Sequence, residues 1–159
     1  MALGAIVILG LARRIHGPIA ARPYLLLPVA GLVVGALAIA FSELTDRGVD
    51  EVLFSGQETL PDLVADAGSW SAAALWGLIL FKGLAWSLSL ASFRGGPVFP
   101  AMLLGSAAGV LASHLPGIGL TPAVAVGLGA AAAATLRLPL AAVLLAVLLT
   151  ASALSLIHI

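Results

Sequence analysis

The stretch Phe93-Arg94-Gly95-Gly96-Pro97-Val98-Phe99-Pro100 lies between two hydrophobic segments and places two glycines and two prolines within six positions. Proline is favoured in the first turn of a helix, where its missing N–H is not needed, and paired glycines let a backbone approach its neighbours closely. The stretch therefore predicts a helix that is interrupted inside a membrane and starts again at Pro100. The free N–H groups and the macrodipole at such a helix start favour an anion.

The composition around this stretch is that of an integral membrane protein. Hydrophobic residues make up 62% of the 159 residues, charged residues make up 9%, and the mean hydropathy is +1.19. Soluble domains are roughly half apolar and about a quarter charged. At about 20 residues for each complete span, the chain has room for about five or six membrane segments. It contains no cysteine, which excludes disulfides and thiolate metal sites.

The charged residues are segregated along the chain, although the formal net charge is zero. All seven acids lie between Glu43 and Asp66, and we expect this stretch to be a solvated extracytoplasmic loop with a short helix near Pro61 to Val64. Its paired acids lack the ligand spacing of a calcium loop, so we expect no metal site. The cluster of Arg13, Arg14 and Arg22 indicates a cytoplasmic loop by the positive-inside rule.

The hydrophobic segments differ in length, and only some of them are long enough to span a bilayer. In chain order they are Met1 to Ala12, Tyr24 to Leu44, Ser71 to Leu90, Ala101 to Leu115, Ala123 to Leu136 and Leu140 to Thr150. The second and third are long enough to span a bilayer, whereas the last two are each too short to span comfortably. Short segments interrupted by proline or glycine are typical of a transporter core.

Local residues predict how these segments begin, end and pack. His16-Gly17-Pro18 is expected to break any helix after the first segment, and Thr121 to cap the helix that Pro122 begins. Gly105 and Gly109 predict a smooth packing face on the fourth segment, and Gly31 with Gly35 is a weaker signal of the same kind.

Lys82 lies inside the third segment, where an ionisable side chain is expensive and normally faces a partner or an aqueous cavity. It is therefore a candidate pathway charge, together with Arg94 at the helix break. The alternative for Lys82 is snorkelling from the inner half of its helix to the interface, and the sequence favours neither interpretation.

Taken together, these residues resemble the CLC family of chloride channels and proton-coupled chloride antiporters. Gly95 to Pro100 is similar to the family's Gly-x-Phe-x-Pro motif at the start of its helix N, and Ala134 to Leu140 is similar to its later Arg-x-Pro element. The resemblance extends over residues 1–153 and corresponds to the family's helices from the end of J through P. It implies an all-α integral membrane fold with the broken and re-entrant helices of an inverted-repeat transporter, of which this is the second repeat.

The resemblance also implies a function and a set of site residues. It implies transport of an anion, with chloride as the expected ion, by a channel or an anion/proton antiporter. The full-length protein would be a homodimer and a multi-pass bacterial protein of the plasma membrane. The anion-binding residues would be Gly96, Val98 and Phe99. Supporting residues at the helix start and in the two motifs would be Gly95, Pro97, Pro100, Arg137 and Pro139. No catalytic residue, cofactor, metal or nucleic-acid partner is expected.

Three departures from the family pattern bear on this function. The phenylalanine falls one position late, so Pro97 removes a backbone donor near the anion; the helix ending at Thr150 has no glutamate; and the family's gating glutamate, together with its anion-binding serine and tyrosine, has no counterpart here. We therefore expect the chain to be inactive alone. A non-conducting membrane assembly protein and a CLC-like fluoride or nitrate transporter remain alternatives. An intramembrane enzyme is disfavoured because the spans offer no nucleophile with a base and no metal pair.

The final residues, Leu154-Ser-Leu-Ile-His-Ile159, resemble the translated end of a transposon-based sequencing adaptor. On this interpretation residues 154–159, including His158, do not belong to the natural protein. The alternative is a genuine short apolar terminus.

Overall fold

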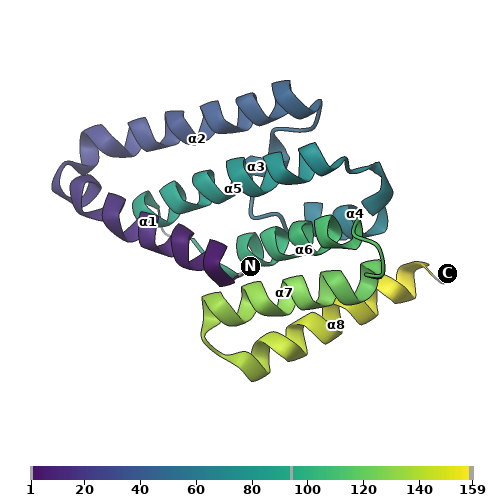
Figure 1. Cartoon of the computed structure of the whole chain (residues 1–159). Helices are drawn as coiled ribbons and strands as arrows, with labels where there is room; N and C mark the ends of the chain where they lie inside the picture. The colour runs from purple at the N-terminus through teal and green to yellow at the C-terminus, as the bar shows by residue number, and fades with distance from the viewer. Residues whose placement is uncertain (1, 94, 158–159) are drawn as a thin grey trace.

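The computed structural model describes residues 2–93 and 95–157, and within them it contains helices and no strand. The predicted all-α class is confirmed (Figure 1). In chain order the elements are α1 (Ala2–Ala21), α2 (Pro23–Thr45), α3 (Asp50–Leu53), α4 (Thr59–Ala65), the short 3₁₀ helix η1 (Ala67–Ser69), α5 (Ala72–Ser92), α6 (Val98–Ser113), α7 (Leu120–Leu136) and α8 (Pro139–Ile157).

Helix α5 lies at the centre and packs against α1, α2, α3 and α6 (Figure 1). Its start is capped by Ser71, whose Oγ accepts the N–H of Ala74 at 3.1 Å. Among the described residues, α2 and α5 are the two helices long and apolar enough to cross a bilayer. Only 17% of the apolar window of α2 is buried, against 44% for α5. The outward apolar face of α2 therefore suits lipid, and α5 belongs to the core of the bundle.

Helix α1 is longer than the sequence predicts, because it continues through His16-Gly17-Pro18 to Ala21. The predicted break is therefore wrong. A proline inside a helix removes one hydrogen bond and adds a steric clash, but tertiary contacts offset this cost. His16 Nδ1 lies 2.9 Å from the carbonyl oxygen of Ala91 in α5, and Ile19 is buried in a cluster with that residue.

Helices α6 and α7 make the most extensive helix contact of the fold, through small residues. A Cβ added at Gly105 would lie 2.7 Å from Ala131 Cβ, and one added at Gly109 would lie 2.6 Å from Val124 Cα. Only glycine permits this approach, so the predicted packing face of α6 is confirmed. No atom comes within 4 Å of a Cβ added at Gly31 or Gly35, so within the described chain these two make no such contact.

Several helix ends differ from the predicted ones. Helix α6 begins at Val98, two residues before Pro100, and α7 begins at Leu120 after Gly119, so Thr121 is not the cap. Helix α8 continues past Thr150 to Ile157, so it is longer than the predicted short segment. The interpretation of residues 154–159 as adaptor-derived stays a prediction.

The acidic stretch is not simply a solvated loop. The predicted short helix is present as α4, but α3 was not predicted, and both helices pack into the bundle against α2, α5, α6 and α8. Val52, Leu60 and Leu63 are buried, whereas most of the acids between them remain exposed. Apolar side chains at these positions draw the segment inward while the carboxylates stay at its surface.

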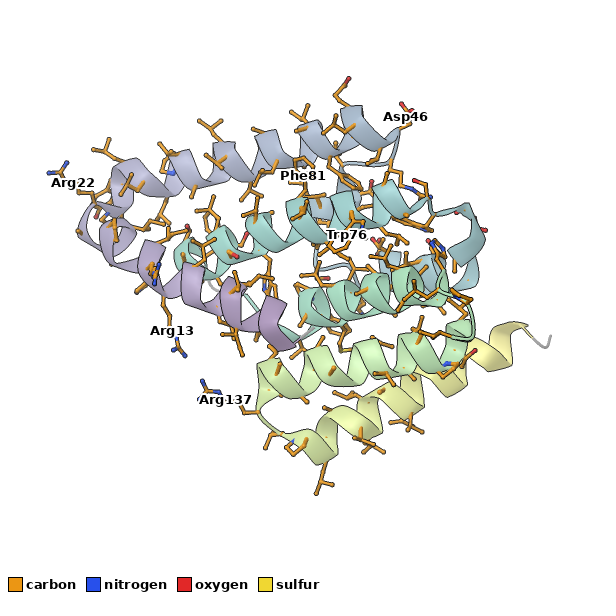
Figure 2. The ribbon with its side chains drawn as sticks, viewed as in Figure 1. Arg13, Arg22, Asp46, Trp76, Phe81 and Arg137 are labelled. Carbon is orange, nitrogen blue, oxygen red and sulfur yellow. The ribbon has the colours of Figure 1, made fainter. Side chains whose placement is uncertain are left out.

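The labelled charged residues divide between the two ends of the bundle, and Arg47, which pairs with Glu51, lies outside this division. Figure 2 shows Arg13, Arg22 and Arg137 at one end and Asp46 at the other. The orientation predicted from the sequence, with the basic end in the cytoplasm, needs this separation and stays a prediction.

Candidate functional site

Two helix ends meet beside the middle of α5. Lys82 is the eleventh of the 21 residues of α5, and its ammonium contacts the C-terminal end of α3. Ala101 in the first turn of α6 packs in one cluster with Trp86, one turn further along α5. Helix α6 therefore starts partway along α5 and not at its end (Figure 1). The glycine–proline stretch therefore separates two helices, as predicted, although α6 begins at Val98 and not at Pro100. The depth of this break in a membrane stays a prediction.

Lys82 caps the C-terminal end of helix α3. Its side chain is 2% exposed, and its Nζ donates to the carbonyl oxygens of Glu51 at 2.9 Å, Val52 at 3.0 Å and Phe54. An ammonium has three donors, so all are used. The last carbonyls of a helix lack partners within the helix, and a buried cation satisfies them here. Burial rules out snorkelling, and these bonds leave no N–H of Lys82 free for a passing ion.

A cleft of about 220 Å³, here called the inner cleft, lies between α3, α5 and the break before α6. Lys82, Trp86 and Ser89 line it from α5, and Gly95, Gly96 and Pro100 line it from the break. The remaining lining residues are Val52, Leu53, Phe54, Ser55, Ala85, Leu90 and Phe93. The fold therefore brings Lys82 and the two glycines, which are separate features of the sequence, into one cleft. None of these residues is acidic.

The start of α6 offers two backbone donors. Pro97, the residue before the helix, and Pro100 have no N–H, and the N–H of Ala101 bonds the Pro97 carbonyl at 3.4 Å. Val98 and Phe99 are left with the N–H groups of the first turn. Neither lines the inner cleft, and the Phe99 side chain is 40% exposed. Arg94 lies outside the described residues.

Gly96 is required neither by close packing nor by an unusual backbone conformation. Its φ angle is not positive, and a Cβ added to it would meet no atom within 4 Å. The possibility that Gly96 adopts a left-handed conformation is thereby excluded. A methyl group at this position would instead project into open space beside the inner cleft.

A second cleft, here called the outer cleft, occupies about 770 Å³ between α3, α4 and η1. Five of its lining residues are acids: Asp50, Glu51, Glu58, Asp62 and Asp66. Arg47 is its single basic residue; its guanidinium lies 3.4 Å from the Trp70 ring centroid and 3.7 Å from Glu51 Oε1. Burial raises the pKa of Glu51 above its ordinary value, and Arg47 opposes that rise. Phe54 and Ser55 line both clefts.

A helix that starts inside the bundle, with backbone N–H groups unpaired among the described residues, is an arrangement that suits an ion-binding position. Comparison with known families agrees with a transport protein. A family model described as "Voltage gated chloride channel" matches residues 3–159. The chain belongs to the voltage-gated chloride channel family. The predicted resemblance to this family is confirmed, and with it the membrane setting and anion transport as the general activity. No curated protein and no solved structure matches the chain.

In this chloride channel family member, the two motif elements do not converge on the inner cleft. Arg137 ends α7 in a left-handed conformation with φ 56°, and Pro139 begins α8. Both residues are exposed, and neither lines the cleft that Gly95, Gly96 and Pro100 line. In the described structure the Arg-x-Pro element forms the turn between α7 and α8, which pack together. Its part in transport stays a prediction.

Two lining residues of this family member were not singled out from the sequence. Trp86 is 6% exposed, and its Nε1 is buried without a hydrogen-bond partner. The Ser89 carbonyl accepts the N–H of Phe93 at 2.7 Å, whereas its hydroxyl makes no hydrogen bond among the described residues. Their spacing from Lys82, four and seven residues, would have placed all three on one helix face. The missing information was that this face borders the break before α6.

Proposed function

We propose that this chain is one of the two repeats of a CLC-type transport protein and that the transported anion is chloride. The observation that carries the proposal is the start of α6 beside the middle of α5, where the N–H groups of Val98 and Phe99 have no partner among the described residues. Backbone donors that point at a fixed position replace part of the hydration shell of an ion without adding a charge.

The surroundings of this helix start support an anion over a cation. Among the described residues, no carboxylate lines the inner cleft next to Gly96, and the buried charge that lines it is the ammonium of Lys82. Both the helix dipole and this ammonium favour a negative ion.

The exposed position of Phe99 supports a site that is completed by another repeat. An ion held at a repeat interface takes ligands from both halves, so one repeat alone supplies too few. We therefore expect no anion flux from liposomes that contain only these 159 residues, and flux from a homodimeric protein that joins them to a first repeat. Selective anion flux from this chain alone would contradict the two-repeat proposal.

The role of the helix start is tested by changing its donors. In a protein with both repeats, Val98→Pro removes one N–H and should weaken chloride binding about tenfold or more, because hydrogen bonds to charged groups contribute about 1.5–3 kcal/mol. Val98→Ala keeps the N–H and is the matched control, and Pro97→Ala adds a donor and should tighten binding. Calorimetric titration with chloride and fluoride measures all three. Equal affinity in Val98→Pro and Val98→Ala would show that the α6 start does not hold the ion.

A further inference from the structure

The inner cleft is lined by a buried ammonium that contacts no counter-ion and by an indole N–H that has no hydrogen-bond partner among the described residues. We propose that this cleft binds a small monovalent anion of its own, held by the indole N–H of Trp86 and the hydroxyl of Ser89 and attracted by the ammonium of Lys82. This second position is separate from the N–H groups of Val98 and Phe99. It rests on the proposed function only in the class of ion that it takes.

The first argument is the charge of Lys82. Its three hydrogen-bond partners are neutral carbonyl groups, and in the described part of the chain the only ion pair joins Arg47 to Glu51. Asp50 and Glu51 act on Lys82 from a distance but line the outer cleft. An anion nearby strongly stabilises the charged form of a buried cation that has no counter-ion in contact.

The second argument is the unused donor of Trp86. More than nine-tenths of this residue is buried, and its Nε1 has no hydrogen-bond partner. Buried indole N–H groups normally have one, so an isolated one requires an explanation. Trp86 also lines a small apolar cavity of about 50 Å³ with Ile8 and Leu104, whose walls offer no hydrogen-bond acceptor, so the inner cleft is the polar space that it borders. The Nε1 atom is covered in this conformation, and an anion in the inner cleft reaches it after a small rotation of the indole.

The third argument is the shape and lining of the cleft. Lys82, Trp86 and Ser89 lie on one face of α5, and the opposite side is formed by Ser55 and by Gly95 and Gly96. The volume of about 220 Å³ exceeds the roughly 30 Å³ that one water occupies in the liquid, so a halide or nitrate fits with a few waters.

The lining also predicts which anion is preferred. Ala85, Leu90 and Phe93 are apolar walls of the cleft. They cannot replace the hydration shell of a strongly hydrated ion. We therefore expect iodide, bromide and nitrate to bind more tightly than fluoride.

Tryptophan fluorescence provides a direct test, because iodide quenches an indole that it contacts. The chain has three tryptophans, so Trp70→Phe with Trp76→Phe leaves Trp86 as the only fluorophore in the detergent-purified 159-residue chain. At constant ionic strength, quenching by iodide should saturate, and adding Ser89→Ala should raise the half-saturating concentration. Quenching that stays linear in iodide, or saturation unaffected by Ser89→Ala, would overturn the proposal.

A second test removes the donor itself. Trp86→Phe should weaken iodide binding by roughly ten- to hundredfold in calorimetry, because one hydrogen bond to a charge is lost. Trp76→Phe is the matched control, since Trp76 is on the same helix but 55% exposed. Equal affinity in the two variants would also overturn the proposal.

These tests separate the inner cleft from the proposed function. Val98→Pro should leave the saturable quenching of Trp86 unchanged if the two positions are distinct, and loss of the quenching in that variant would overturn the separate site. Saturable quenching in a two-repeat protein without anion flux would support the cleft and refute transport. Flux with linear quenching would refute the cleft and leave transport standing.

Discussion

The outer and inner clefts share Phe54 and Ser55 but have opposite electrostatic character. Five acids and one arginine line the outer cleft, whereas the inner cleft has no acid and one buried lysine. The outer cleft is also the larger, at about 770 Å³ against about 220 Å³. A strongly acidic and a cation-containing space are therefore separated by a single short stretch of chain.

The difference arises because the four-residue helix α3 contributes different groups to the two clefts. The side chains of Asp50 and Glu51, in the first turn of α3, belong to the outer cleft, while backbone carbonyls at its C-terminal end accept hydrogen bonds from the ammonium of Lys82. Acids near a helix start and a cation near its end both suit the helix dipole. The geometry of α3 thus keeps its carboxylates away from the cleft at the α6 break.

Removing the cation should have the largest effect. Lys82→Met leaves the carbonyls of Glu51, Val52 and Phe54 without their donor, and each buried group without a partner costs about 1–3 kcal/mol. We expect a loss of about 3 kcal/mol or more in unfolding free energy, and faster hydrogen exchange over residues 50–56. Denaturant unfolding in detergent measures the first. Leu84→Met, on the outward face of the same helix, is the control, and a Lys82→Met variant as stable as that control would contradict the cap.

Placing an acid in the inner cleft should have the next largest effect. Ser89→Asp puts a carboxylate near the proposed anion, and at about 5 Å and an effective dielectric constant of about 20 the repulsion is about 3 kcal/mol. Iodide binding should weaken roughly a hundredfold. Ser89→Asn has nearly the same shape without the charge and should weaken it far less. If both variants bind iodide equally well, the inner cleft does not discriminate by charge.

Glu51, which lines the outer cleft, should make the unfolding free energy depend on pH. Its pKa is raised by burial above 4.5, so its contribution to stability is fully present below about pH 4.5 and is lost as pH rises through the folded pKa. Glu51→Gln should abolish this part of the thermal-unfolding profile. Glu58→Gln, at an exposed position of the same cleft, should retain it. A profile identical in the protein with Glu51 and in Glu51→Gln would refute the assignment.

The exposed acids of the outer cleft should have the smallest effect. Asp62→Asn with Asp66→Asn reduces the negative potential that an approaching anion meets, so the rate of iodide quenching of Trp86 should rise a few-fold at low salt. Screening should remove the difference at high salt, where the Debye length falls to about 3 Å at 1 M. Stopped-flow fluorescence at two salt concentrations measures this, and a salt-independent difference would indicate a structural effect instead.

Much of the helix framework follows from local sequence. The apolar run Tyr24 to Leu44 lies within α2, Pro23–Thr45. A run of this length and composition forms a helix because a helix pairs its backbone N–H and C=O groups within the segment, as a membrane requires. The predicted end of the first helix failed for the opposite reason. His16 and Ile19 form contacts with α5 that no local rule on Pro18 includes.

The candidate site was predicted only in part. The break at Gly95 to Pro100 was found because glycine and proline change the backbone locally. The cap role of Lys82 was not found, because its partners lie 28 to 31 residues earlier in the chain. Trp86 carries no local sign of function, since an apolar aromatic side chain in a membrane helix is ordinary.

By itself the sequence determined the membrane class, the segregation of acids and bases and the interrupted helix. These follow from composition and from the backbone chemistry of glycine and proline, which act within a few residues. Only the tertiary structure decided that the end of α3 and the start of α6 meet beside Lys82, and that one cleft is acidic while its neighbour holds a cation. Hydrogen bonds and burial between distant residues set these features, because they depend on which helix faces come together and not on the order of residues along any one helix.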